Sequence, residues 1–269
     1  MQHTLQLYFR LISIQVRSQM QYRASFLWDT LSTGILNASY FVAVALTLEK
    51  FGSIGGWQVS DLAFLVGMAE VSFGLMDMIF SGFDPDAFSP MVRQGRFDQY
   101  LLRPVDITWQ VMGSRFVLRR LGRVLGGLVI LLLSLGFSNI VWTPLKALYL
   151  PVLVISQIMA FGALFIAGAT LIFWTVQPLE AVNIVTYGGN ELISYPMHIY
   201  PDLIRHLFTY LLPMMFMNYL PATYILGKPD LLGFPEFSRF LAPLLGALML
   251  LAALRFWKFG INHYQGTGS

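Results

Sequence analysis

Long runs of mostly apolar residues constrain this chain more than any other feature. A helix rises about 1.5 Å per residue, so about 20 apolar residues cross the hydrocarbon core of a membrane. Five runs meet this requirement: 26–48, 62–80, 117–137, 150–176 and 240–259. A sixth, 203–226, is apolar enough but contains Pro213 and Pro221, so we expect this helix to be kinked or broken. The sequence therefore predicts an all-α membrane protein with a bundle of six transmembrane helices, five or seven being the alternatives.

The composition excludes a soluble domain. Hydrophobic residues make up 56% of the 269 residues and charged residues only 12%, whereas a soluble domain has about a quarter of its residues charged. The net charge of +3 is too small to indicate a nucleic-acid partner. The absence of cysteine excludes disulfides and thiolate metal sites.

Residues 1–24 are predicted to form an amphipathic helix in the membrane interface. Apolar residues recur at spacings of three and four, the period of one helical face: Leu5, Phe9, Ile12, Val16 and Met20. Polar and cationic residues fill the other side: Gln6, Arg10, Ser13 and Arg17. We expect the cationic face to meet lipid headgroups. The alternative is an ordinary helix that packs on the core.

The basic residues predict the orientation, since they favour the cytoplasmic side. With the N-terminus inside, thirteen lysines and arginines lie inside and four outside: Lys50, Lys146, Lys228 and Arg239. Both termini are therefore expected on the cytoplasmic side of the inner membrane. Two inner loops follow from this topology, 84–115 and 178–202, and the second is expected to be a short helix along the inner face. The outer segment 227–239 is either re-entrant or a plain surface loop.

No catalytic constellation was found in the sequence. It has no G-x-x-x-x-G-K-[ST] phosphate loop, no H-E-x-x-H and no G-x-S-x-G. The four histidines are scattered, so no metal site is predicted. The chain is therefore not expected to be an enzyme by itself.

Two carboxylates, Glu70 and Asp77, fall inside the second apolar run. They lie seven residues apart and share one helical face. An ionisable group in hydrocarbon costs a few kcal/mol, so both should face protein or a water-filled cavity. One interpretation is a substrate- or proton-binding pair. The other is ion pairing with the arginines of the third run, which are Arg119, Arg120 and Arg123.

Two further features bear on helix packing. Asp29 and Asn37 in the first run are expected to hydrogen-bond between helices. Gly122 and Gly126 form a small-xxx-small step, which permits close approach of another helix.

Three segments resemble a known family. Residues 93–104 read RQGRFDQYLLRP, which resembles the loop that follows the second span of type-two ATP-binding-cassette (ABC) export permeases. Residues 195–201, YPMHIYP, and 256–264, FWKFGINHY, resemble the inner loop and the ending of one branch of these permeases. The order of the segments and the expected topology fit that family over essentially the whole chain.

The resemblance implies a function and a set of partners. The segment 88–102 would be a coupling helix that docks on a separate ATPase subunit, and two such subunits would bind ATP and magnesium. The contacts carried over from the family are Arg93, Arg96, Phe97, Asp98 and Tyr100. The family further implies a second permease subunit, identical or different, and export of a cargo by alternating access. The apolar spans would suit an amphipathic cargo.

Two other classes of protein compete with this interpretation. A proton-coupled secondary transporter would use Glu70 and Asp77, but no internal repeat relates the two halves of the chain, as many such folds show. A lipid-modifying membrane enzyme would need a catalytic constellation. Transport that requires ATP and a partner ATPase distinguishes the permease from both.

Overall fold

The computed structural model describes residues 2–51, 53 and 55–266, and this part of the chain is entirely helical where it is regular. The six long helices are α1 (Gln2–Gln19), α2 (Arg23–Phe51), α3 (Val59–Ile79), α7 (Leu121–Phe137), α8 (Pro144–Thr175) and α13 (Ala242–His263). The short helices are α4 (Pro85–Arg93), α5 (Asp98–Leu101), α6 (Ile107–Ser114), α9 (Glu180–Asn183), α10 (Gly189–Ile193), α11 (Asp202–His206) and α12 (Tyr219–Leu226). Single 3₁₀ turns and two π-helical turns, Ile184–Gly188 and Leu207–Leu211, connect them.

Four helices of the described part are long and apolar enough to cross a membrane: Val59–Ile79, Leu118–Phe137, Pro144–Thr175 and Ala242–His263. They contain most of four of the predicted runs, so these runs are confirmed as apolar helices. The run 26–48 lies within α2, whose 29 residues measure about 44 Å. The chain is therefore a multi-pass membrane protein.

Helix α3 forms the centre of the bundle and is buried along nearly its whole length. Glycines allow its neighbour α7 to approach closely: a Cβ on Gly67 or Gly127 would collide with the facing backbone. On its other side α7 meets α2, where Gly122 lies against the Thr30 backbone and Gly126 faces Gly34. The predicted small-xxx-small step is thus confirmed as a helix contact.

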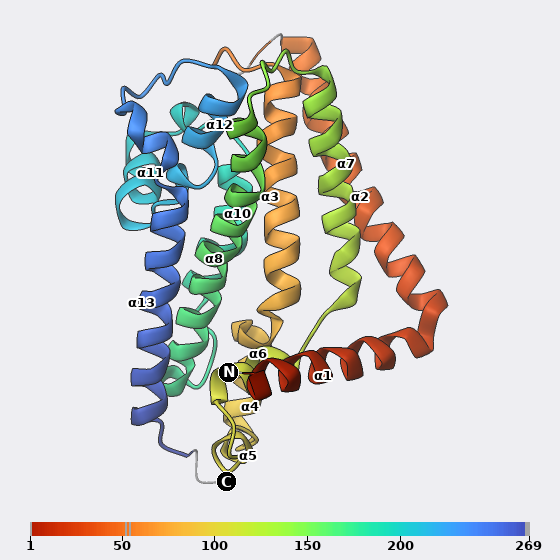
Figure 1. Cartoon of the computed structure of the whole chain (residues 1–269), viewed down its shortest axis with the longest axis vertical. Helices are drawn as coiled ribbons and strands as arrows, with labels where there is room; N and C mark the ends of the chain where they lie inside the picture. Colours follow the sequence, from red (N-terminus) through yellow and green to blue (C-terminus); the bar gives the residue numbers. More distant parts are fainter. Residues whose placement is uncertain (1, 52, 54, 267–269) are drawn as a thin grey trace.

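The two ends of the bundle differ. Helix α1 lies across one end, together with α4, α5, α6 and the C-terminal end of α13 (Figure 1). We call this the terminal end. The α2–α3 connection, with Gly55 and Trp57, lies at the opposite end (Figure 1).

The sequence predicted that residues 178–202 form a short helix along the inner face of the membrane, and this prediction is wrong. Val182 packs near Gly168 and Pro85 toward the terminal end, whereas His198 Nε2 lies 3.0 Å from the Gly55 carbonyl oxygen at the opposite end. The segment therefore runs the length of the bundle beside α3. Some of its polar side chains bond to protein: Asn190 donates to Glu70, and the Thr186 and Ser194 hydroxyls donate to backbone carbonyls of the segment. Its irregular turns are tolerated where neighbouring helices bury them.

The predicted span 203–226 is also wrong as a crossing. It begins and ends at the opposite end, because it follows His198 and because Lys228 Nζ lies 2.7 Å from the Asp61 carboxylate. Between these points the chain descends through α11, breaks at Pro213, and returns through α12. Asn218, at the start of α12, donates to the carbonyl of Leu65 at 3.0 Å. Residues 202–226 are thus a re-entrant hairpin whose second half, from Met214 to Ile225, is mostly buried and contacts α3 through α12, whereas much of 202–211 is exposed.

Proline explains this shape only in part. Pro213 breaks the helix, as predicted. Pro221 lies in the first turn of α12, where a missing amide donor leaves no hydrogen bond unmade. About half of the residues of segment 227–239 are exposed, and its end forms the 3₁₀ helix Glu236–Phe240. Its two alternatives, a re-entrant element or a plain surface loop, stay predictions.

Candidate functional site

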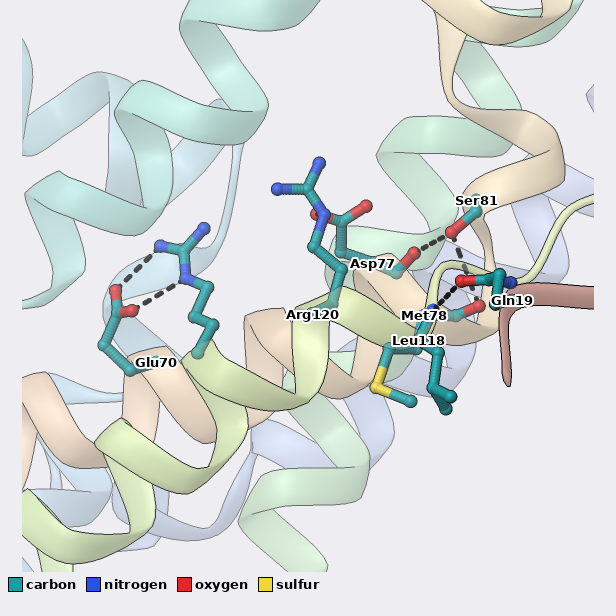
Figure 2. A network of polar contacts seen from close by, with 8 residues as sticks. Gln19, Glu70, Asp77, Met78, Ser81, Leu118 and Arg120 are labelled. Atoms are coloured by element: carbon teal, nitrogen blue, oxygen red, sulfur yellow. Dashed lines mark hydrogen bonds and ion pairs between the residues drawn. The ribbon is translucent and has the colours of Figure 1, made fainter. Parts of the chain in front are cut away.

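The bundle core contains an ion pair between α3 and α7. Glu70 accepts two hydrogen bonds from Arg123, from Nε to Oε2 and from Nη2 to Oε1, each 2.7 Å long (Figure 2). The side chains are only 9% and 14% exposed. This parallel, two-bond geometry is the strongest that arginine and a carboxylate form.

Two amides complete the surroundings of Glu70. Asn37 of α2 donates to Oε2 at 3.1 Å, and Asn190 of α10 donates to Oε1 at 3.2 Å. The guanidinium of Arg123 also lies over the Phe73 ring, 4.5 Å from its centroid. Glu70 therefore connects α3 to α2, α7 and α10, and it does so through charge-assisted hydrogen bonds.

A second ion pair lies nearer the terminal end. Arg120 Nε approaches Asp77 Oδ2 to 2.7 Å, but the angles are not those of a hydrogen bond. Asp77 is 1% exposed and Arg120 is 29% exposed. One turn further on, the Ser81 hydroxyl donates to the Asp77 backbone carbonyl (Figure 2). The Asp77 carboxylate thus has a cationic neighbour without the full set of hydrogen bonds that Glu70 has.

These contacts confirm the ion-pair interpretation of both carboxylates, with Arg120 and Arg123 as partners. They also confirm Asn37 as an interhelical donor, whereas Asp29 is exposed. Glu70 and Asp77 each face a different arginine, and no described contact joins the two carboxylates directly. Asn190 was not predicted as a partner, since its segment was placed outside the bundle.

The loop between α3 and α6 is built on an aromatic cluster at the terminal end. Phe97 is completely buried, with its ring centroid 5.0 to 6.2 Å from those of Phe88, Phe173, Trp257 and Tyr264. Phe173 belongs to α8 and Trp257 to α13. The cluster fastens the loop to the ends of two long helices.

Polar contacts hold both sides of this aromatic cluster, which we call the aromatic base of the loop. Asp84 caps α4 by accepting from the Asp86 amide at 3.1 Å, and burial raises the pKa of the Asp84 carboxyl. The Tyr264 hydroxyl donates to Asp98 Oδ1 at 2.9 Å. Burial and this bond raise the pKa of Tyr264 to about 12.

The residues beyond this base are exposed and mostly cationic or amphipathic. Arg93, Arg96, Asp98 and Leu102 are exposed, and Leu102 is 85% accessible. Of the five predicted docking residues, Arg93, Arg96 and Asp98 lie on this surface, and Tyr100 is half-buried. Phe97 is not on this surface, because its ring is completely buried, and a direct contact of Phe97 with a partner stays a prediction. An aromatic residue between charges looks like an interface anchor in sequence, but here its ring fills the protein's own core.

Glutamines and asparagines form the contacts that sequence reasoning missed. Gln15 and Gln19 of α1 donate to the carbonyls of Ser114 and Phe116, which orients α1 on the bundle. Gln19 also accepts from the Leu118 amide at 2.9 Å (Figure 2). Uncharged polar residues inside apolar runs were the available signal, since they rarely lie unpaired in a membrane.

The face of α1 that meets the protein differs from the predicted apolar stripe. Tyr8 is buried against Trp109 of α6, with ring centroids 5.6 Å apart, and Leu11 lies against Gly113. Phe9, a member of the predicted stripe, is 65% exposed. Part of that stripe is therefore exposed on the surface of the described chain.

Comparison with known families gave one result that covers most of the chain. A family model described as "ABC-2 family transporter protein" matches residues 35–268. The matched region includes all four of the long apolar helices named above, the loop at the terminal end and the re-entrant hairpin. No curated protein matched the chain.

Proposed function

The chain belongs to the ABC-2 family of transporter proteins, and on this basis we propose that it is the permease subunit of an ATP-driven exporter. The membership carries the proposal because it covers residues 35–268, which include the bundle and the loop between α3 and α6. Such a permease forms the path through the membrane, while ATP and magnesium bind to a separate ATPase subunit.

The loop at the terminal end is the proposed docking element for this ATPase. Its exposed tip carries Arg93, Arg96 and Arg103, and its aromatic base is buried. An exposed cationic tip on a fixed base can bind an acidic groove without a large entropic cost of ordering, because the base is already ordered. Phe97 is proposed to hold this tip in place rather than to touch the partner.

The aromatic base also provides a route for mechanical coupling. Phe97 contacts Phe173 of α8 and Trp257 of α13, so a displacement of the tip acts directly on the ends of two long helices. We propose that closure of two ATPase subunits moves these helices, and with them a second permease subunit, between inward- and outward-open states. The terminal end, with both chain termini, would then be cytoplasmic.

The cargo is proposed to be amphipathic, in keeping with the apolar surface of the bundle. Its direction of movement, outward across the inner membrane, is proposed from the family resemblance of residues 93–104. No described contact of Glu70 or Asp77 favours a proton-driven mechanism, since each carboxylate is held by an arginine.

The test is purification of the tagged chain from its native membrane in mild detergent, with identification of co-purifying ATP-hydrolysing subunits. The variant Arg93→Glu/Arg96→Glu reverses the charge of the exposed tip and should abolish co-purification. The matched control is Arg10→Glu/Arg17→Glu, which reverses two exposed arginines of α1 at the same end and should retain the ATPase. Phe97→Ala is unsuitable as a docking probe, because it opens a cavity in the core.

The proposal would be abandoned if crosslinked native membranes contained no ATPase next to this chain. Equal loss of the ATPase in the α1 control would show that the charge of the whole end matters, and not the loop. Retention of the ATPase by the loop variant, with normal ATP hydrolysis, would place the docking surface elsewhere.

A further inference from the structure

A groove of about 580 Å³ lies at the side of the bundle, close to the terminal end. Its walls come from the last turn of α3 and the following turn, from α6, from α8 and from α13. The residues that define its character are Phe80, Trp109, Leu250, Leu251, Arg255 and Lys258. This groove is separate from the ion pairs of the core and from the exposed arginines of the docking loop, although Phe80, Phe83 and Asp106 at the ends of that loop line it.

The groove changes from apolar to cationic along α13. Leu250, Leu251 and Leu254 line it toward the middle of the bundle, and Arg255 and Lys258 line it toward the terminal end. From Leu250 to Lys258 the helix rises about 12 Å. One end therefore suits hydrocarbon and the other end suits an anion, within the thickness of one membrane leaflet.

The two cations have no acidic partner in the part of the chain that the structure describes. Arg255 and Lys258 are exposed, and neither forms an ion pair there. One acidic residue also lines the groove, Asp106, and its Oδ1 accepts from the Trp109 amide at 3.3 Å as the cap of α6. The positive charge at this end of the groove thus remains largely uncompensated by protein.

From this arrangement we propose that the groove holds an anionic glycerophospholipid. Its phosphate would lie between Arg255 and Lys258, and an acyl chain would lie along Leu250, Leu251 and Phe80. Basic pockets between membrane helices on the cytoplasmic side are suited to lipid headgroups. Trp109 strengthens the site, because its indole suits the boundary between headgroup and hydrocarbon. Assignment to the cytoplasmic leaflet rests on the orientation proposed above.

The charge pattern favours a lipid over a second copy of this chain. A lipid is complementary to both ends of the groove, because its phosphate suits the cationic end and its hydrocarbon suits the apolar end. The groove also connects to α1, because Trp109 packs on Tyr8. A lipid bound here would therefore contact Trp109, which itself packs on the helix that is proposed to lie among the headgroups.

The experiment is native mass spectrometry of the full chain, delipidated in detergent and titrated with phosphatidylglycerol or phosphatidylcholine. We expect phosphatidylglycerol to bind at least about ten-fold more tightly, since each tenfold corresponds to about 1.4 kcal/mol. Arg255→Gln/Lys258→Gln should remove this preference. Leu251→Trp should weaken binding of both lipids by filling the groove without a change of charge.

Matched controls exist for both variants. Leu248→Trp changes an exposed leucine of α13 that does not line the groove, and Arg93→Gln/Arg96→Gln removes two cations from the same end of the molecule. Both should bind phosphatidylglycerol as the wild type does. The thermal midpoint of each variant shows that it is folded.

Equal binding of the two lipids, or an unchanged preference in Arg255→Gln/Lys258→Gln, would overturn the proposal. A lipid-free dimer that Leu251→Trp dissociates would assign the groove to a second copy and would also overturn it. The measurement needs no ATPase, so its failure is separate from a failure of the proposed function. An intact ATPase complex that shows no lipid preference would contradict the proposed lipid site and would leave the proposed transport function unaffected.

Discussion

Two ion pairs join α3 to α7 and to the turn just before it, and they differ in how their charges are satisfied. Glu70 receives two hydrogen bonds from Arg123 and one each from Asn37 and Asn190. Asp77 lies 2.7 Å from Arg120 but lacks a hydrogen bond of good geometry to it. Figure 2 shows both carboxylates from close by.

Depth explains the difference. Glu70 and Arg123 lie in the interior, where nothing but protein can satisfy them, and a charge left without a partner there costs several kcal/mol. Arg120 is 29% exposed and lies nearer the end of the bundle, where a long cationic side chain can reach water or headgroups. The first pair is therefore expected to determine the packing of four helices, and the second to be a local and replaceable contact.

The largest effect is expected from removal of one partner of the inner pair. Arg123→Ala leaves the Glu70 carboxylate buried with only two amides, and we expect a loss of about 3–5 kcal/mol in the free energy of unfolding. Equilibrium unfolding in mixed micelles measures it. Glu70→Met/Arg123→Leu should recover most of the loss, because no charge remains buried. A double variant as unstable as Arg123→Ala would contradict this account.

A smaller loss is expected from the amides around Glu70. Asn190→Ala removes a fully buried donor to a charged acceptor and should cost about 2 kcal/mol. Asn37→Ala is the matched control, because Asn37 donates to the other oxygen from a less buried position, and it should cost about half as much. The same unfolding measurement compares them. A larger loss in Asn37→Ala would show that α10 is not held through Glu70.

The outer ion pair, Asp77 with Arg120, should contribute less to the free energy of unfolding than the Glu70–Arg123 pair. Arg120→Ala is expected to cost about 1–2 kcal/mol, because the Arg120 guanidinium is partly accessible although the Asp77 carboxylate that loses its cation is 1% exposed. The comparison with Arg123→Ala, one helical turn away, is made on the same preparation. Losses of equal size at the two positions would remove the distinction by depth.

The smallest expected effect is a difference between the two ion pairs in how their contribution to stability depends on salt concentration. Screening acts on accessible charges and much less on buried ones. The loss in Arg120→Ala should therefore shrink by a few tenths of a kcal/mol between low salt and 0.5 M, while the loss in Arg123→Ala stays constant. A salt-dependent inner pair would mean that water reaches Glu70.

Much of the fold could be predicted from the sequence. The runs 62–80, 117–137, 150–176 and 240–259 are long apolar helices, because about 20 apolar residues in a row leave few other solutions. The pairing of Glu70 and Asp77 with arginines was also predictable, since unpaired charges are too costly in hydrocarbon. In both cases one strong local energy term decides the result.

The segment from 178 to 226 could not be predicted in the same way. Asn183, Asn190 and Glu191 make its first half too polar for a lipid-facing helix, so a position outside the bundle seemed required. In the structure, Asn190 meets Glu70 across a sequence separation of 120 residues. Polarity that is satisfied inside the bundle cannot be distinguished, in sequence, from polarity that is satisfied by water.

The proposed docking residues show the same division. The sequence identified the loop around residues 93–104, and its exposed arginines are where a partner can reach them. Only the tertiary structure showed that Phe97 turns inward, because the space between Phe173 and Trp257 exists only once α8 and α13 have packed. An aromatic ring is equally suited to a partner's pocket and to the protein's own core.

The sequence by itself determined that this chain enters a membrane, which runs form its long helices, and that its buried carboxylates need cations. Each of these follows from a free-energy cost that a residue carries wherever it is placed in hydrocarbon. The tertiary structure alone decided that 180–198 runs the length of the bundle and that 202–226 folds back. It also decided that a groove opens beside α13 with two cations that form no ion pair within the described residues. These features depend on which partners come together from distant parts of the chain, and hydrogen bonds between such partners leave no periodic signal in the sequence.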